Sequence, residues 1–158
     1  MFLEMKVTGI ALDPFTNTPI VILKDSSGEK ILPIWVGYSE ASSIAMELEK
    51  TPRIRPITHD LLKSIIDMVD CKISKIEVTE LKDNTFYSLM YLRKEEKEIV
   101  IDSRPSDAIA IALRTESPIY VNEEVIKSAQ NIEIDEDTEK LKDVLENIPE
   151  EDFGKYKM

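Results

Sequence analysis

The sequence predicts an α+β fold, in which three principal helices pack on a mainly antiparallel or mixed β-sheet within a single domain. Its length of 158 residues fits one domain of ordinary size. Hydrophobic residues make up 42% and charged residues 32% of the chain, which is enough apolar material for one core. Apolar residues follow the two-residue period of strands in several segments and the helical period in three others.

Three strands are predicted at the start of the chain, at residues 5–13, 19–25 and 30–36. Pro14 and Asn17 supply turn chemistry between the first two segments, which makes them a hairpin candidate. A Ser-Ser-Gly sequence forms the next turn before the third strand.

Three segments have the spacing of amphipathic or buried helices. Ser39 is placed as the N-cap of the first, and Thr58 as the cap of the second. The third, at residues 103–116, contains an apolar run on nearly every side, which predicts burial all round. The second helix is expected to pack inward through its apolar face. The apolar residues of the first two helices are Ala41, Ile44, Ala45, Leu48, Leu62, Ile65, Ile66 and Val69.

The middle of the chain predicts three more strands, at residues 72–81, 85–94 and 99–102. Asp83-Asn84 is a good turn pair between the first two of them, so an antiparallel arrangement is expected. A short strand at 119–121 and a short helix at 123–129 follow.

Composition divides the chain into a domain at residues 1–130 and an acidic, partly helical appendage at 131–158. The appendage holds 10 acidic and 4 basic side chains, a net of -6, so residues 1–130 carry -5 of the total -11. Such a surface repels polyanions. We interpret the appendage either as a solvated segment that competes with nucleic acid for basic side chains, or as a last helix at 140–148 that docks on the body.

The cellular setting is predicted from what the sequence lacks. No apolar run approaches the length of a membrane span, and the start has no leader pattern, so we expect a cytoplasmic protein with no membrane association. Cys71 is the only cysteine and is expected to be a small buried hydrophobe. Lys and Glu dominate the charges and Gln130 is the only glutamine, a bias that suggests a thermophilic source.

Two stretches of the sequence stand out together, at residues 33–41 (PIWVGYSEA) and 101–110 (IDSRPSDAIA). With residues 55–61 (RPITHDL) and 118–121 (PIYV), they resemble the bifunctional-nuclease domain family. The resemblance covers roughly residues 1–125.

The resemblance implies hydrolysis of the phosphodiester bonds of DNA and RNA. Two other readings of the same fold stay open: a non-catalytic oligomeric module that binds a protein or ligand, and a self-assembling structural protein. The acidic surface and the missing base-stacking motif fit the binding module better. Short strand edges and ample apolar surface predict self-association as a homo-oligomer, with a dimer favoured.

Metal-assisted cleavage of a phosphodiester needs carboxylates for Mg²⁺ or Mn²⁺ and a cation for the phosphate charge. Asp102 and Asp107 are the candidate metal ligands and catalytic carboxylates, and Arg104 is the candidate phosphate-binding cation. The structural alternative is that Asp102 or Ser103 caps the third helix, Pro105 fits its first turn and Asp107 complements its dipole.

His59 is the only histidine and therefore the natural candidate for a general base, although a solvated imidazole is common in the first turn of a helix. Arg53 and Arg55 share a proline-stiffened loop and are candidate substrate-binding residues. If there is a site, Asp102, Arg104 and Asp107 should line one surface with Arg55 or His59.

Other residues favour structural interpretations. Glu40 and Glu47 are expected on the solvated face of the first helix. Trp35 is expected in the core instead of serving as a base-stacking platform. The same is expected of Phe86, Tyr87 and Tyr91.

Overall fold

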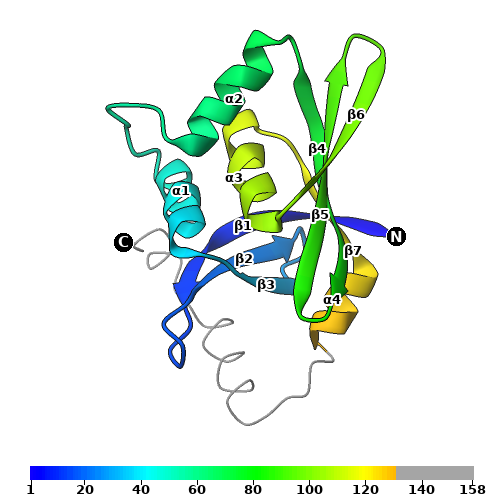
Figure 1. Ribbon diagram of the computed structural model, residues 1–158. Coiled ribbons are helices and arrows are strands. Elements are labelled where there is room, and N and C mark those ends of the chain that lie inside the picture. Colours follow the sequence, from blue (N-terminus) through cyan, green and yellow to red (C-terminus); the bar gives the residue numbers. More distant parts are fainter. Residues whose placement is uncertain (131–158) are drawn as a thin grey trace.

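Two three-stranded meanders are joined edge to edge by a short strand into one seven-stranded sheet (Figure 1). The computed structural model describes residues 1–130. The strands are β1 (Phe2–Leu12), β2 (Pro19–Asp25), β3 (Ile31–Trp35), β4 (Lys72–Lys82), β5 (Thr85–Lys94), β6 (Lys97–Ser103) and β7 (Ile119–Asn122). Their order in the sheet is β3-β2-β1-β7-β4-β5-β6.

The joining strand β7 makes the sheet mixed. It pairs antiparallel with β1 and parallel with β4. All pairs within the two meanders are antiparallel, because each links neighbours in the chain through a tight connection. At the β4–β5 turn Asp83 and Asn84 both have positive φ, 52° and 58°, as a two-residue hairpin turn requires.

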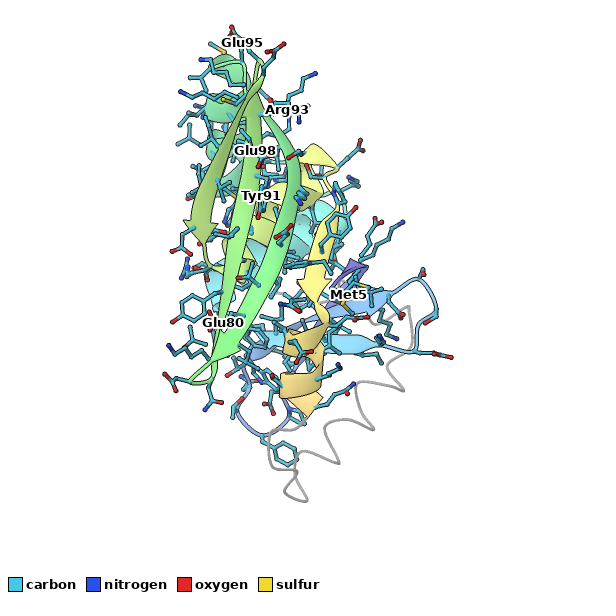
Figure 2. The ribbon with its side chains drawn as sticks, turned by 90° about the vertical axis from the view of Figure 1, so that its right-hand side faces the viewer. Met5, Glu80, Tyr91, Arg93, Glu95 and Glu98 are labelled. Atoms are coloured by element: carbon cyan, nitrogen blue, oxygen red, sulfur yellow. The ribbon has the colours of Figure 1, made fainter. Side chains whose placement is uncertain are left out.

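Three helices lie on one face of the sheet: α1 (Tyr38–Leu48), α2 (Thr58–Met68) and α3 (Pro105–Thr115). In Figure 2 they lie behind β4, β5 and β6, whose near face carries side chains such as Tyr91 and Glu98. A fourth helix, α4 (Glu123–Gln130), contacts β3, β4 and β7. The described part of the chain therefore has the predicted α+β fold, with four helices where three principal ones were expected.

In each of the first three helices the N-cap residue differs from the predicted one. The N-caps are Gly37, Ile57 and Arg104, all with extended backbone. Asp102 and Ser103 do not cap α3, because both remain paired with β5 in the sheet. Pro105 does occupy the first turn of α3, where its missing amide hydrogen costs nothing.

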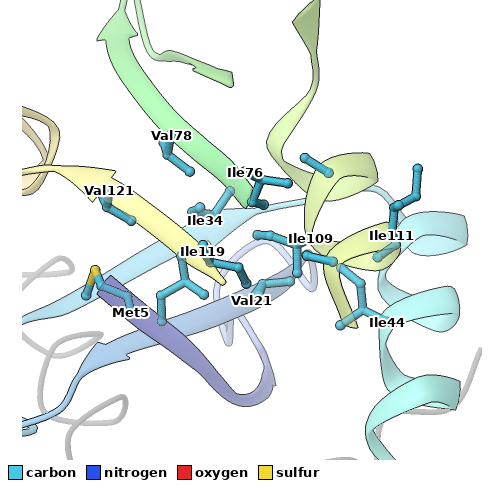
Figure 3. Close-up of a cluster of buried hydrophobic side chains, with 14 of the residues drawn as sticks. Met5, Val21, Ile34, Ile44, Ile76, Val78, Ile109, Ile111, Ile119 and Val121 are labelled. Atoms are coloured by element: carbon cyan, nitrogen blue, oxygen red, sulfur yellow. The ribbon is translucent and has the colours of Figure 1, made fainter. Parts of the chain in front are cut away.

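The core lies between the sheet and these helices (Figure 3). Every residue of α3 from Ala108 to Ala112 is at most 2% exposed, so the predicted all-round burial is confirmed. Cys71 is also buried, as expected. The core side chains labelled in Figure 3 are Met5, Val21, Ile34, Ile44, Ile76, Val78, Ile109, Ile111, Ile119 and Val121.

Two aromatic residues expected in the core are exposed. Trp35 is 42% exposed at the end of the edge strand β3, where its Nε1 donates to Asp13 Oδ2 at 2.9 Å. Tyr87 is equally exposed on β5. An edge position and the face turned away from the helices explain the difference, since neither place is covered by another layer.

No helix within residues 1–130 is long and apolar enough to cross a membrane. The predicted boundary of the acidic appendage and its helix at 140–148 lie outside the described residues.

Ile109 provides a test of the core. Its side chain is fully buried in α3, so Ile109→Ala should lower the unfolding free energy by about 3 kcal/mol. The matched control Ile54→Ala changes a fully exposed side chain and should cost less than about 0.5 kcal/mol. Denaturant unfolding measures both. Equal effects for the two variants would contradict the arrangement of the core.

Candidate functional site

Polar side chains from α1, α2 and α3 meet where the three helices pack together. On α1 they recur at helical spacing, and on α3 two of them lie seven residues apart, so each set occupies one helix face. We call this group the polar seam. It consists of Glu40, Ser43, Glu47, Arg53, His59, Asp60, Arg104, Asp107 and Arg114.

The outer end of the seam is an arginine held by two carboxylates. Arg104 Nη2 lies 2.9 Å from Glu40 Oε1 and 2.8 Å from Asp107 Oδ2, and Arg104 Nε donates to the same Asp107 oxygen at 2.9 Å. The hydrogen bond with Asp107 and then that with Glu40 raise the pKa of Arg104 above its ordinary value. The Arg104 side chain is nevertheless 68% exposed, and its Nη1 has no hydrogen-bond partner among the described residues.

Glu40 reaches Arg104 by folding back over the start of α1. A Cβ atom at Gly37 would collide with Glu40 Oε2. Glycine at this position therefore permits the conformation in which Glu40 holds Arg104. This contact gives a physical reason for a glycine three residues before the glutamate in the stretch that resembles the nuclease family.

His59 occupies the middle of the seam. Its Nε2 lies 3.0 Å from Asp107 Oδ1, and its Nδ1 lies 2.6 Å from Ser43 Oγ. The side chain is 9% exposed, because it points between α1 and α3 from the first turn of α2. The imidazole is therefore buried and joins α1 to α3 through its two nitrogens, whereas its place in the first turn of a helix also allowed a solvated side chain.

Arg114 is the buried centre of the inner half. Its side chain is 2% exposed and donates to Asp60 Oδ1, Ala110 O and both the carbonyl and hydroxyl oxygens of Ser43, at 2.8 to 3.1 Å. These acceptors belong to all three helices. The sequence analysis did not single out Arg114, Ser43 or Asp60, although an arginine immediately after a fully apolar helical run is a signal for a buried, paired cation.

The inner end of the seam contains Asp60, Arg53 and Glu47. Burial opposes ionisation of Asp60, but hydrogen bonds from Arg114 and from the Ile57 amide outweigh it and lower the pKa of Asp60. Arg53 Nη2 contacts Glu47 Oε2 at 2.8 Å. Arg53 Nε lies 3.3 Å from Asp60 Oδ2, an ion-pair distance without hydrogen-bond geometry.

The structure brings together some of the predicted site residues. Arg104, Asp107 and His59 are in direct contact. Asp102 is not among them: Ser103 and Ser88 share a face through a 3.0 Å hydroxyl contact, and its neighbour Asp102 projects from the opposite face of the sheet.

The two loop arginines are in different environments. Arg53 is mostly buried and bound by Glu47 and Asp60, which leaves its guanidinium committed within the protein. Arg55 is exposed and makes no ion pair or hydrogen bond with the described residues. Arg55 and Arg104 therefore have guanidinium surface available to a ligand, whereas Arg53 is a structural contact.

The predicted metal pair does not fit this geometry. Asp102 projects from the sheet face that the first three helices leave uncovered, whereas Asp107 belongs to α3 on the other side. Both oxygens of Asp107 are already engaged by His59 and Arg104. Within residues 1–130 no three His, Cys, Asp or Glu side chains gather closely enough to hold a metal ion. Mg²⁺ or Mn²⁺ stays a prediction without an assigned set of protein ligands.

The fold and the seam define an α+β domain with an arginine–carboxylate–histidine cluster between three helices. The family model described as the bifunctional nuclease domain matches residues 21–134. Two proteins from strains of Mycobacterium tuberculosis, both called uncharacterized, are 34% identical over 162 residues, or 95% of this chain and 97% of theirs. The chain belongs to the bifunctional nuclease domain family.

Plant relatives share the domain within longer proteins. Bifunctional nuclease 1 of Oryza sativa subsp. indica is 30% identical over 116 residues, which are 72% of this chain and 35% of the rice protein. Bifunctional nuclease 1 of Arabidopsis thaliana is 27% identical over 115 residues, 70% of this chain and 35% of the plant protein. The chain thus corresponds to about a third of each plant protein.

The lowered pKa of Asp60 predicts a pH-dependent contribution to stability. Because the folded pKa lies below the ordinary value of 3.8, this contribution is complete above about pH 5 and is lost as the pH falls through the folded pKa. Asp60→Asn should therefore be less stable than the wild type at pH 7, and this gap should narrow below about pH 4.

Asp67→Asn is the control, because it removes an exposed carboxylate from the same helix. At pH 7 it should change the unfolding free energy by less than about 0.5 kcal/mol. Urea unfolding across the pH range measures all three proteins. A wild-type advantage over Asp60→Asn that persists unchanged at pH 3 would contradict the assignment.

Proposed function

We propose that this domain hydrolyses phosphodiester bonds of nucleic acid at the outer end of the polar seam. The observation that carries the proposal is the meeting of Glu40 from one family-like stretch with Arg104 and Asp107 from the other. His59, from a third such stretch, touches the same carboxylate. The names of the plant relatives, bifunctional nucleases, support the reaction class.

Arg104 is the residue suited to bind the phosphate. Its guanidinium is exposed, has a free Nη1 and can grip two phosphate oxygens. On a chain with a net charge of -11, such a cation is needed where a polyanion is to approach. Phosphate binding at Arg104 also competes with its contact to Asp107 Oδ2.

Asp107 is the residue suited to accept the proton from water. Once the phosphate engages Arg104, Oδ2 is released while His59 still holds Oδ1. Water then attacks phosphorus, its proton passes to Oδ2, and the bond to the leaving oxygen breaks as that oxygen takes up a proton from solvent. Asp107 is partly exposed, whereas both nitrogens of His59 face protein atoms.

An assay with single-stranded and duplex DNA and RNA tests the proposal, in the presence of Mg²⁺, Mn²⁺ or a chelator. Arg104→Gln should reduce kcat/KM by about 100-fold, because it removes the cation that stabilises charge on the phosphate. Asp107→Asn should cause a similar loss. Arg93→Gln, which changes an exposed arginine on β5, should cleave like the wild type.

Comparison of the reactions with Mg²⁺, Mn²⁺ and chelator tests the predicted metal requirement separately from the roles assigned to Arg104 and Asp107. Absence of cleavage by the wild type under all three conditions would overturn the proposed function. Cleavage that is unchanged in Arg104→Gln would show that the reaction does not take place at the outer end of the polar seam.

A second candidate is the oligomeric binding module, and the exposed face of α2 favours it. Five apolar residues of α2 and its C-cap lie on one arc and are 38–82% exposed. Leu62, Ile65 and Val69 among them were predicted to pack inward, and that prediction is wrong because no described element covers this side of the helix. We propose that a second copy of the chain covers this face. The residues are Leu61, Leu62, Ile65, Met68 and Val69.

Charge and area support a second copy as the occupant. Helical spacing places no charged side chain of α2 among these five residues, so this face of an acidic protein can approach a second copy without charge repulsion. Burying the five side chains on two copies covers on the order of 1,000 Å², near the lower end of a specific interface. A two-fold axis brings the same face of both copies together.

Self-association is tested by Ile65→Asp combined with Met68→Asp. Two desolvated charges at the centre of the face should shift a dimer to a monomer at micromolar concentration. Phe15→Asp, an exposed apolar residue in the β1–β2 turn, should leave the dimer intact. Sedimentation velocity measures the mass, and a wild-type monomer at high micromolar concentration would end this idea.

A further inference from the structure

We propose that Arg114 and Ser43 are positioning residues that fix His59 as a neutral imidazole with its proton on Nε2, where it orients Asp107. His59 then acts as a hydrogen-bond donor and not as a general base. The donor and acceptor roles are inferred only from the contacts of Arg114, Ser43 and His59 with one another and with Asp107. Only its consequence for cleavage rests on the proposed function.

Arg114 determines which atoms donate and which accept along this chain of hydrogen bonds. A guanidinium has donors and no acceptor, so the Nη2 contact to Ser43 Oγ at 2.9 Å makes that oxygen an acceptor. The other Arg114 contacts, to Asp60, Ala110 and the Ser43 carbonyl, hold the guanidinium in this position. The side chains of Arg114 and Ser43 are nearly inaccessible, so solvent does not replace these partners.

The Ser43 hydroxyl in turn determines which His59 nitrogen accepts a hydrogen bond. A hydroxyl has one proton, and the acceptor within reach is His59 Nδ1 at 2.6 Å. Nδ1 must therefore be unprotonated. An imidazole with a proton on Nδ1 would turn Ser43 Oγ into an acceptor of two donors and leave the buried hydroxyl proton without an acceptor among the described residues.

His59 Nε2 accordingly carries the ring proton and donates it to Asp107 Oδ1 at 3.0 Å. This order differs from a serine nucleophile with its histidine base, in which the serine is accessible and gives up its proton during attack. Here Ser43 is buried and bound by an arginine. The chain Arg114–Ser43–His59 thus ends at Asp107 and leaves only Oδ2 to face Arg104 and a substrate.

Because His59 is the only histidine, nitrogen NMR reports on it without ambiguity. Long-range proton–nitrogen correlation on the uniformly ¹⁵N-labelled chain at pH 8 should show Nε2 protonated and Nδ1 unprotonated. In Ser43→Ala the Nδ1 resonance should move to higher frequency, because it loses a hydrogen-bond donor. Ser39→Ala, an exposed serine of the same helix, should leave the spectrum unchanged.

A proton found on Nδ1 of the wild type would overturn the proposal, whatever the variants do. In the cleavage assay Ser43→Ala should lower kcat roughly tenfold with KM within twofold, as expected for one lost orienting hydrogen bond, and Ser43→Thr, which keeps the hydroxyl, should restore it. Unchanged kcat in Ser43→Ala would overturn the positioning role. A wild type that shows the Nε2 proton but cleaves nothing would overturn the proposed function and leave the hydrogen-bond direction standing.

Discussion

The arrangement of the helices depends on a buried guanidinium. Removing a charged group from water costs several kcal/mol unless its donors are satisfied, and Arg114 meets this requirement only where α1, α2 and α3 supply acceptors together. The apolar core fixes the distance between the helices and the sheet. The donors of Arg114 additionally fix how the helices are placed against one another, because its acceptors, on Asp60, Ala110 and Ser43, come from each of them.

Charge alternates along the seam, and this order gives its two ends different properties. Arg114 and Arg53 lie on either side of Asp60 in the protected inner half, where the contacts stabilise the packing. Arg104 sits between Glu40 and Asp107 at the outer end, where one edge of its guanidinium meets solvent. The same pairing chemistry thus serves structure on one side and leaves a cation available on the other.

The helices and strands could be predicted from the sequence, but not all of the contacts between side chains on different elements. Periodicity identified the strands and the buried helix. The family-like stretches predicted a group of Asp102, Arg104 and Asp107 with Arg55 or His59, of which Arg104, Asp107 and His59 are in contact. Alternation along β6 places Asp102 on the opposite face of the sheet from Ser103, and this could not be decided before the end of the strand and the start of α3 were known. Ser43 and Arg114 were missed because their role arises from contacts between residues 71 positions apart.

The four-residue strand β7 has a consequence for how the protein forms during synthesis. The strands of each meander are neighbours in the chain and can pair as soon as they emerge, since their loops are short. The two meanders share no ladder of their own and must wait until Ile119–Asn122 leaves the ribosome to complete both edges at once. Until then the edge of β1 is unpaired, and so is the edge of β4 once residues 72–82 have been made, so the nascent chain carries two aggregation-prone borders that Ile119–Asn122, its last described strand, closes.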